Sequence, residues 1–230
     1  MISFKISNFD ELQFNDNLIT LEIHNKQLYR NIIESFKAYV ASTELKENII
    51  FFENSKSVNW AKKIVICNPE SIEYEMKNIQ KKLITIISEE LYSDIEFLSK
   101  LEVNYSTLIE QIEGKIIEHD IDLVINSDFT PDKFLKFVNL NIKLPDSGIL
   151  SQLYQYVDVV TELNLYEVVV FTNIKLFLDS NELLELFKYI IYKKLNCILL
   201  ENISNDIIDY ETKLVIESDF NDYTENPSTT

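Results

Sequence analysis

The sequence predicts an α/β protein: a head built on a mainly parallel sheet, with an α-helical leg domain inserted into it. Short apolar runs alternate with amphipathic helical patterns at both ends of the chain, which is typical of parallel sheets covered by helices. Between these parts the pattern is helical only, and the last residues are polar. We therefore predict a head of residues 1–67 and 140–218, a leg of residues 68–139, and a disordered tail of residues 219–230.

Short apolar runs that end in polar residues predict the strands of the head. They cover residues 2–7, 18–23, 48–54, 62–68, 141–144, 166–173, 196–202 and 213–218. Residues 26–41 carry apolar side chains at helical spacing, which predicts a helix packed on one face. Two more helices are expected at 149–163 and after Asp179, which has capping-box spacing with Glu182.

The leg has the periodicity of two long helices of about 24 residues, or about 36 Å, each. Pro69 fits the first turn of the first helix, and a third, shorter helix begins near Thr130 with Pro131 in its first turn. The long runs have near-heptad apolar seams. These seams predict either an antiparallel hairpin or a seam shared with another subunit.

The charge balance favours a protein that repels polyanions. The chain has 38 acidic and 21 basic residues, for a net charge of −17, so its surface is expected to repel nucleic acid and anionic membranes. Arg30 is the only arginine, and lysines hold phosphates as point charges without reading bases. Cys67 and Cys197 lie at apolar runs, as buried free thiols of a cytoplasmic protein do.

The glycine content excludes the usual nucleotide-binding loops. The chain has two glycines, Gly114 and Gly148, whereas such loops need several so that backbone amides can close around phosphate. The first strand-to-helix corner instead carries Glu22, Ile23, His24, Asn25 and Lys26. The sheet is thus expected to be a scaffold, with His24 either a surface histidine or a functional remnant.

The densest acidic segment is residues 113–132. It contains the carboxylates of Glu113, Glu118, Asp120, Asp122, Asp128 and Asp132. Carboxylates this close repel one another unless water screens them or a hard cation binds among them. The spacing is not that of an EF-hand. It leaves open a solvated acidic face, a calcium site, or a magnesium-dependent nuclease.

Glu118-His119-Asp120-Ile121-Asp122-Leu123 resembles the Glu-[His/Asn]-x-x-Asp-Leu motif of the type II-A CRISPR spacer-acquisition ring protein, the second Csn family. The segments 141–163 and 168–202 also resemble that family in the order and spacing of their elements. The resemblance implies a head like a P-loop NTPase that has lost its phosphate loop. It also implies a non-catalytic homotetrameric ring that binds calcium, encircles double-stranded DNA with a preference for ends, and acts with the spacer integrase and the guide-RNA effector nuclease.

Carried over to this chain, the motif makes Glu118 and Asp122 the first candidates for calcium ligands. The further candidates are Asp120, Asp128 and Asp132. Val124 stands where family members often have a glutamate, which removes one expected ligand oxygen.

DNA contact by an acidic protein requires lysines to be segregated from the carboxylates. Lys77, Lys81 and Lys82 have the spacing i, i+4, i+5 on the first leg helix. Further candidates are Lys62, Lys63, Lys100, Lys115, Lys193 and Lys194. Each could instead be an ordinary solvated lysine. Two other functions remain open: a metal-dependent nuclease that uses Asp120 and Asp122, and a protein-interaction scaffold that does not bind DNA.

Overall fold

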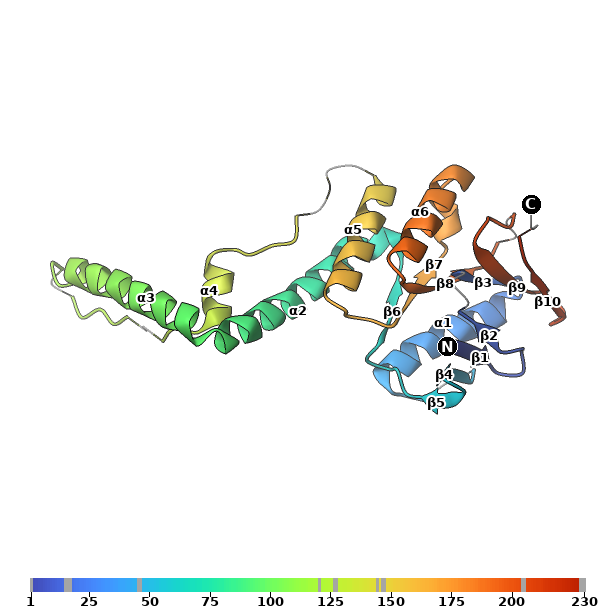
Figure 1. The fold of residues 1–230 in the computed structure, drawn as a ribbon, viewed down its shortest axis with the longest axis horizontal. Coiled ribbons are helices and arrows are strands. Elements are labelled where there is room, and N and C mark those ends of the chain that lie inside the picture. Colours follow the sequence, from blue (N-terminus) through green and yellow to red (C-terminus); the bar gives the residue numbers. More distant parts are fainter. Residues whose placement is uncertain are drawn as a thin grey trace. The chain divides into compact units, whose positions relative to one another are not determined.

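The computed structural model has a mixed α/β fold that divides into two compact units (Figure 1). The head unit is Met1–Glu75 with Leu144–Thr230, and the leg unit is Met76–Lys143. The sequence placed these borders at residues 67/68 and 139/140; in the structure the first falls at 75/76, within α2 (Ile72–Ser93), and the second at 143/144. The structure describes residues 2–14, 18–44, 47–119, 121–125, 128–143, 145, 148–203 and 206–227.

The larger sheet of the head is mainly parallel, as predicted. Its order is β10-β9-β3-β8-β7-β6, and all neighbours are parallel except the antiparallel pair β9–β10. The strands are β3 (Leu18–Ile23), β6 (Ile64–Cys67), β7 (Val168–Thr172), β8 (Asn196–Glu201), β9 (Glu211–Ile216) and β10 (Asp222–Glu225). Strands β3 and β7 are buried at every residue, because helices cover both faces of the sheet.

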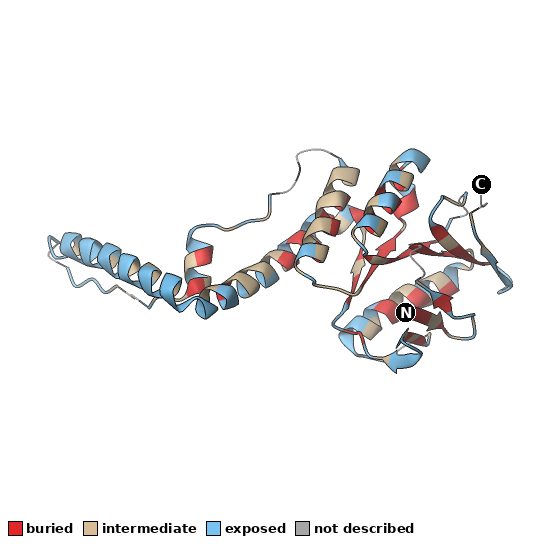
Figure 2. Cartoon of the chain, viewed as in Figure 1, coloured by how far each residue is buried: buried red, intermediate tan, exposed pale blue. Residues whose placement is uncertain are grey.

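Helix α1 (Lys26–Ala41) covers one face of this sheet, and α5 (Ile149–Glu162) and α6 (Ser180–Tyr192) cover the other (Figure 1). On the α1 side, Phe36 and Ile32 pack in one cluster with Leu21 of β3. On the other side, Tyr156 of α5 meets Phe171 edge to face, with ring centroids 6.1 Å apart. Buried residues therefore concentrate along the strands and the facing helix stripes (Figure 2). The capping box predicted at Asp179 and Glu182 starts α6.

The strands predicted at residues 2–7 and 48–54 do not join the parallel sheet, which corrects the sequence expectation. They form a second, antiparallel sheet of order β2-β1-β4-β5. Its strands are β1 (Ile2–Ile6), β2 (Leu12–Gln13), β4 (Ile49–Glu53) and β5 (Lys56–Val58). Asn54 and Ser55 both have positive φ, as a two-residue hairpin turn requires, and they return the chain antiparallel from β4 to β5.

The long leg helices form but do not fold back on each other as a hairpin. α3 (Ile95–Ile116) runs on from the end of α2, and Asp94 between them caps α3 while its N–H still bonds the Glu90 carbonyl at 3.2 Å (Figure 1). A single capping residue is too short to reverse the chain. The third helix, α4 (Pro131–Phe137), packs through Phe134 on Phe129, which in turn contacts Tyr105 of α3.

Two further expectations about local structure were wrong. Residues 141–143 form no strand, because the Gln80 side chain binds this segment through the Ile142 N–H (2.8 Å) and the Leu140 carbonyl; residue 144 lies outside the described residues. The tail is not disordered throughout, since Asp222–Glu225 pair with β9 as β10.

Cys67 and Cys197 are buried free thiols, as predicted, and burial raises the pKa of Cys67 to about 12. No helix in the described part of the chain is both long enough and apolar enough to span a bilayer.

The packing of α1 on β3 predicts the effect of one substitution. Phe36→Ala should lower the free energy of unfolding by about 3–5 kcal/mol, because it removes a fully buried ring from a close-packed cluster. The adjacent, exposed Lys37→Ala should change it by less than about 0.5 kcal/mol. Urea denaturation of both variants measures the difference, and equal losses would contradict this packing.

Candidate functional site

The predicted acidic ligands lie in the leg unit, around the end of α3 and the start of α4. Glu118 pairs with Lys115 at 3.0 Å and Asp132 with Lys136 at 3.2 Å, while Asp122 is exposed. Asp120 lies outside the described residues. In the described part of the chain, no three Asp, Glu, His or Cys side chains gather as a metal-binding group. The oxygen donors suit calcium by type, but the described ones do not form a cage, and the calcium site stays a prediction.

The predicted DNA-binding lysines are divided between the two units. Lys77, Lys81 and Lys82 are exposed together on α2 of the leg unit. Lys115 is paired with Glu118, and in the head unit Lys63 pairs with Glu167 at 3.4 Å beside the exposed Lys62. Of the other lysines considered, Lys100 pairs with Glu96 and Lys193 with Asp158. Only the α2 group brings three of the predicted lysines onto one helix.

The leg unit also has an uncovered apolar face. α3 buries none of its residues, and Leu108 and Ile112 are 58% and 50% exposed. Together with Tyr105, Phe129 and α4 they line a mainly apolar cavity of about 440 Å³.

A buried set of charged and polar side chains, which the sequence analysis did not identify, lies on the parallel sheet between the first residue of β9 and the carboxyl ends of β3 and β8. We call it the strand-end cluster; its members are Thr20, Glu22, Lys175, Glu201, Glu211 and Lys213. In the sheet register, Thr20 is level with Lys213 and Glu22 with Glu201. Residues paired in register point to the same face of a sheet, so β3, β8 and β9 present these side chains together.

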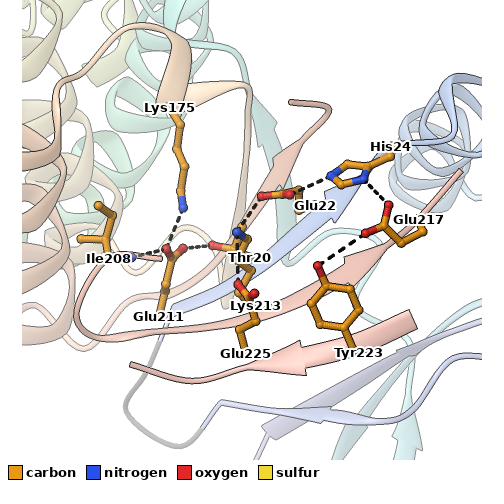
Figure 3. Close-up of polar contacts among 10 residues, drawn as sticks. All are labelled: Thr20, Glu22, His24, Lys175, Ile208, Glu211, Lys213, Glu217, Tyr223 and Glu225. Atoms are coloured by element: carbon orange, nitrogen blue, oxygen red, sulfur yellow. Dashed lines mark hydrogen bonds and ion pairs between the residues drawn. The ribbon is translucent and has the colours of Figure 1, made fainter. Parts of the chain in front are cut away.

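Two buried ion pairs neutralise most of the cluster (Figure 3). The Lys175 ammonium lies 2.6 Å from Glu211, which also accepts hydrogen bonds from the Thr20 hydroxyl and, at 2.7 Å, from the Ile208 N–H. The Lys213 ammonium lies 2.8 Å from Glu22. Burial would lower the pKa of Lys213, but hydrogen bonds and the charges of Glu22 and Glu225 outweigh it, so this pKa is raised.

Glu201 is the third buried carboxylate of the cluster. Burial raises the pKa of Glu201 to about 7, and the N–H of Lys175, 3.3 Å from its carboxylate, only partly opposes this. The nearby Tyr29 hydroxyl has its pKa raised to about 12 by burial and by the charge of Glu201. With two ammonium groups for three carboxylates, the cluster has no surplus cation to offer an anion.

The start of α1 is closed to phosphate as well. In phosphate-binding α/β proteins the free N–H groups at this helix end bind the anion. Here the Asn25 side chain caps the helix by accepting from the N–H groups of Gln27 and Leu28, both at 3.0 Å. The N–H groups of Gln27 and Leu28 therefore already have a hydrogen-bond acceptor within the protein.

A signal for the cluster was present in the sequence. Glu22 and Glu201 each follow a largely apolar run in a strand, and Lys213 directly precedes one. A charged residue in a strand that is buried on both faces needs a partner, but the partner on the neighbouring strand follows only from the register.

Comparison with known proteins gives consistent matches. The family model of the CRISPR-associated protein Csn2 matches residues 39–220. The CRISPR-associated protein Csn2 of Streptococcus agalactiae is 21% identical over 201 residues, which is 87% of this chain and 89% of that protein. The crystal structure of Stu0660 of Streptococcus thermophilus aligns with a TM-score of 0.60 at 14% identity, covering 97% of this chain and 76% of that one.

The raised pKa of Glu201 predicts how stability depends on pH. The unfolded carboxyl titrates near 4.5 and the folded one near 7, so the folded state binds more protons between these values. This group therefore costs about 3 kcal/mol of stability as pH rises from about 4.5 to 7. Glu201→Gln should keep the hydrogen bonds, remove this fall, and be more stable than the parent at pH 8 in chemical denaturation. A parallel pH profile for both proteins would refute the assignment.

Proposed function

Since the chain belongs to the Csn2 family of CRISPR-associated proteins, which gives it a role in CRISPR adaptation, we propose that it acts there as a non-catalytic, sequence-independent binder of double-stranded DNA. Four copies form a ring that calcium stabilises and that accepts linear duplex from its ends. It acts in the cytoplasm with the CRISPR integrase complex and the guide-RNA effector nuclease. The head is a P-loop-NTPase-like scaffold without a phosphate loop.

The exposed lysines of α2 are the observation that carries the DNA-binding proposal. Lys77, Lys81 and Lys82 lie within about a turn and a half of one helix. Lysine ammonium groups hold phosphates as point charges, which suits binding that ignores sequence. One such group binds weakly, but an assembly presents several copies to the same duplex, and linked weak contacts multiply in affinity.

Calcium would neutralise the acidic segment that follows the end of α3. Glu118 and Asp122, with Asp120, Asp128 and Asp132 nearby in sequence, supply the oxygen ligands that calcium prefers. A bound divalent cation cancels negative charge that would otherwise repel phosphate. Its binding therefore favours DNA association without any chemical step.

The apolar face of α3 supports self-association. A solvent-facing helix that exposes Leu108 and Ile112 beside an apolar cavity gains stability when another surface covers it. A second copy of the same leg offers apolar side chains at matching spacing.

The DNA-binding proposal is tested by replacing Lys77, Lys81 and Lys82 together with Gln. Affinity for linear duplex should fall by about tenfold or more, and the salt dependence of binding should become shallower, because fewer counterions are released. Fluorescence anisotropy over a range of salt concentrations measures both. Replacing the exposed α1 and β5 lysines Lys26, Lys37 and Lys56 by Gln is the matched control and should have little effect.

The same assay includes calcium and then a chelator. Chelation should weaken binding by the parent protein, and the double variant Glu118→Gln/Asp122→Asn should bind weakly in both conditions. Binding that is flat in salt and insensitive to chelation would contradict the proposal. Cleavage of the duplex with magnesium would favour the nuclease alternative instead.

Self-association through α3 predicts that Leu108→Glu gives a smaller assembly than the parent, because it places a charge on the apolar face. Ser106→Glu adds the same charge at an exposed polar position of the same helix and should leave the assembly intact. Sedimentation velocity gives the masses. Unchanged mass for Leu108→Glu would show that this face is not an interface.

A further inference from the structure

His24 lies between two carboxylates that belong to different parts of the head unit. Its Nε2 is 2.8 Å from Glu22 at the end of β3, and its Nδ1 is 2.7 Å from Glu217, which follows β9 (Figure 3). A neutral imidazole has one N–H donor, whereas an imidazolium has two. Carboxylates only accept hydrogen bonds, so this arrangement is complete only when His24 is protonated.

Each of these carboxylates is also connected to β10 through side-chain contacts. The second oxygen of Glu22 pairs with Lys213, which also lies 3.4 Å from Glu225 of β10. The second oxygen of Glu217 accepts a hydrogen bond from the Tyr223 hydroxyl of β10 at 3.5 Å. His24 thus links the corner between β3 and α1 to β10 through two sets of contacts, one through Glu22 and one through Glu217.

Backbone contacts at His24 and Asn25 also hold the end of β9 and the segment after it. The His24 N–H bonds the Ile216 carbonyl at 2.9 Å, and the Asn25 side chain donates to the Ser218 carbonyl at 3.1 Å. The segment that they hold leads into β10, a four-residue strand that pairs only with β9 in the described sheet. A short edge strand has few ladder bonds, so side-chain contacts make up much of its stability.

β10 also forms a wall of a polar cleft of about 700 Å³. Glu22 and Lys213 line the cleft from β3 and β9, Tyr223 and Glu225 line it from β10, and Asn226 lines it just after β10. Movement of β10 would therefore change access to the buried Glu22–Lys213 pair.

We propose that protonated His24 is a clasp that holds β10 against the end of β3, and that loss of its proton releases β10 and opens the polar cleft. All members of the clasp belong to the head unit.

The direction of the pH dependence follows from the contacts. Hydrogen bonds to Glu22 and Glu217 raise the pKa of His24 above its ordinary 6.5, although partial burial opposes them. A histidine whose pKa is higher in the folded state stabilises fully below its unfolded pKa and loses this effect as pH rises through the folded value. Release of β10 is therefore expected above pH 6.5, on the neutral to alkaline side.

The test measures amide exchange in the full chain, as protection corrected for the intrinsic effect of pH. At pH 6, His24→Gln should reduce protection of residues 216–225 by about tenfold, as the loss of charge-assisted hydrogen bonds predicts, while β7 is unaffected. At pH 9 the parent should match the variant. His119→Gln, at the other, exposed histidine, is the matched control and should behave like the parent.

Glu217→Gln gives a second test at a partly exposed position that does not endanger the fold. It should lower the pKa of His24, measured by NMR in the His119→Gln background, and weaken protection of β10 at pH 6. A His24 pKa at or below 6.5 in the parent, or protection of residues 216–225 that does not change between pH 6 and 9, would overturn the clasp.

Discussion

The head depends on pairing buried charges within one small region of its parallel sheet. Desolvating an ion is costly, and removing one partner of a buried pair leaves that cost uncompensated. Here Glu22 and Glu211 each lie within 2.8 Å of a lysine ammonium. One pair joins β3 to β9, and the other joins β9 to the segment that follows β7. Strands β3 and β9 and the segment at Lys175 must therefore keep their register, because a shift of one residue would separate every pair. Glu22 lies near the carboxyl end of β3, and the carboxyl ends of the strands are where ligands usually bind in α/β sheets.

The same pairing supports the interpretation of the parallel sheet as a scaffold. Glu22 and Glu201, at the carboxyl ends of β3 and β8, belong to the internal strand-end cluster, and Asn25 caps the start of α1. Lys175 and Lys213 are paired with Glu211 and Glu22 inside the head, so they are not available at its surface to bind an anion. A role in DNA binding consequently rests on lysines elsewhere, of which the α2 group is the most concentrated, and on cations or assembly that offset the carboxylates.

Much of the fold follows from local patterns. The fully buried run of β3, the periodicity of α1 and the capping box of α6 are each encoded within a few residues, so the sequence alone predicts them. Partner choice between strands is not local: β1 and β4 carry apolar runs like those of β3, yet they pair antiparallel with each other in a separate sheet. β10 has little apolar character, and its pairing with β9 is part of a tertiary context that includes His24 and Glu217. The strand-end cluster was missed for the same reason, because the partners of Glu22 and Glu211 lie 191 and 36 residues away in the chain.

The internal charge pairing is tested most directly by ¹⁵N NMR of the lysine ammonium groups at neutral pH. Exposed lysines exchange their ammonium protons rapidly with water, whereas buried, hydrogen-bonded ones are shielded. The account predicts slowly exchanging, fully protonated signals from Lys175 and Lys213, assigned by Lys→Met variants, against fast exchange for Lys77 and Lys81. Fast exchange at Lys175 and Lys213, or a nitrogen shift typical of a neutral amine, would contradict it.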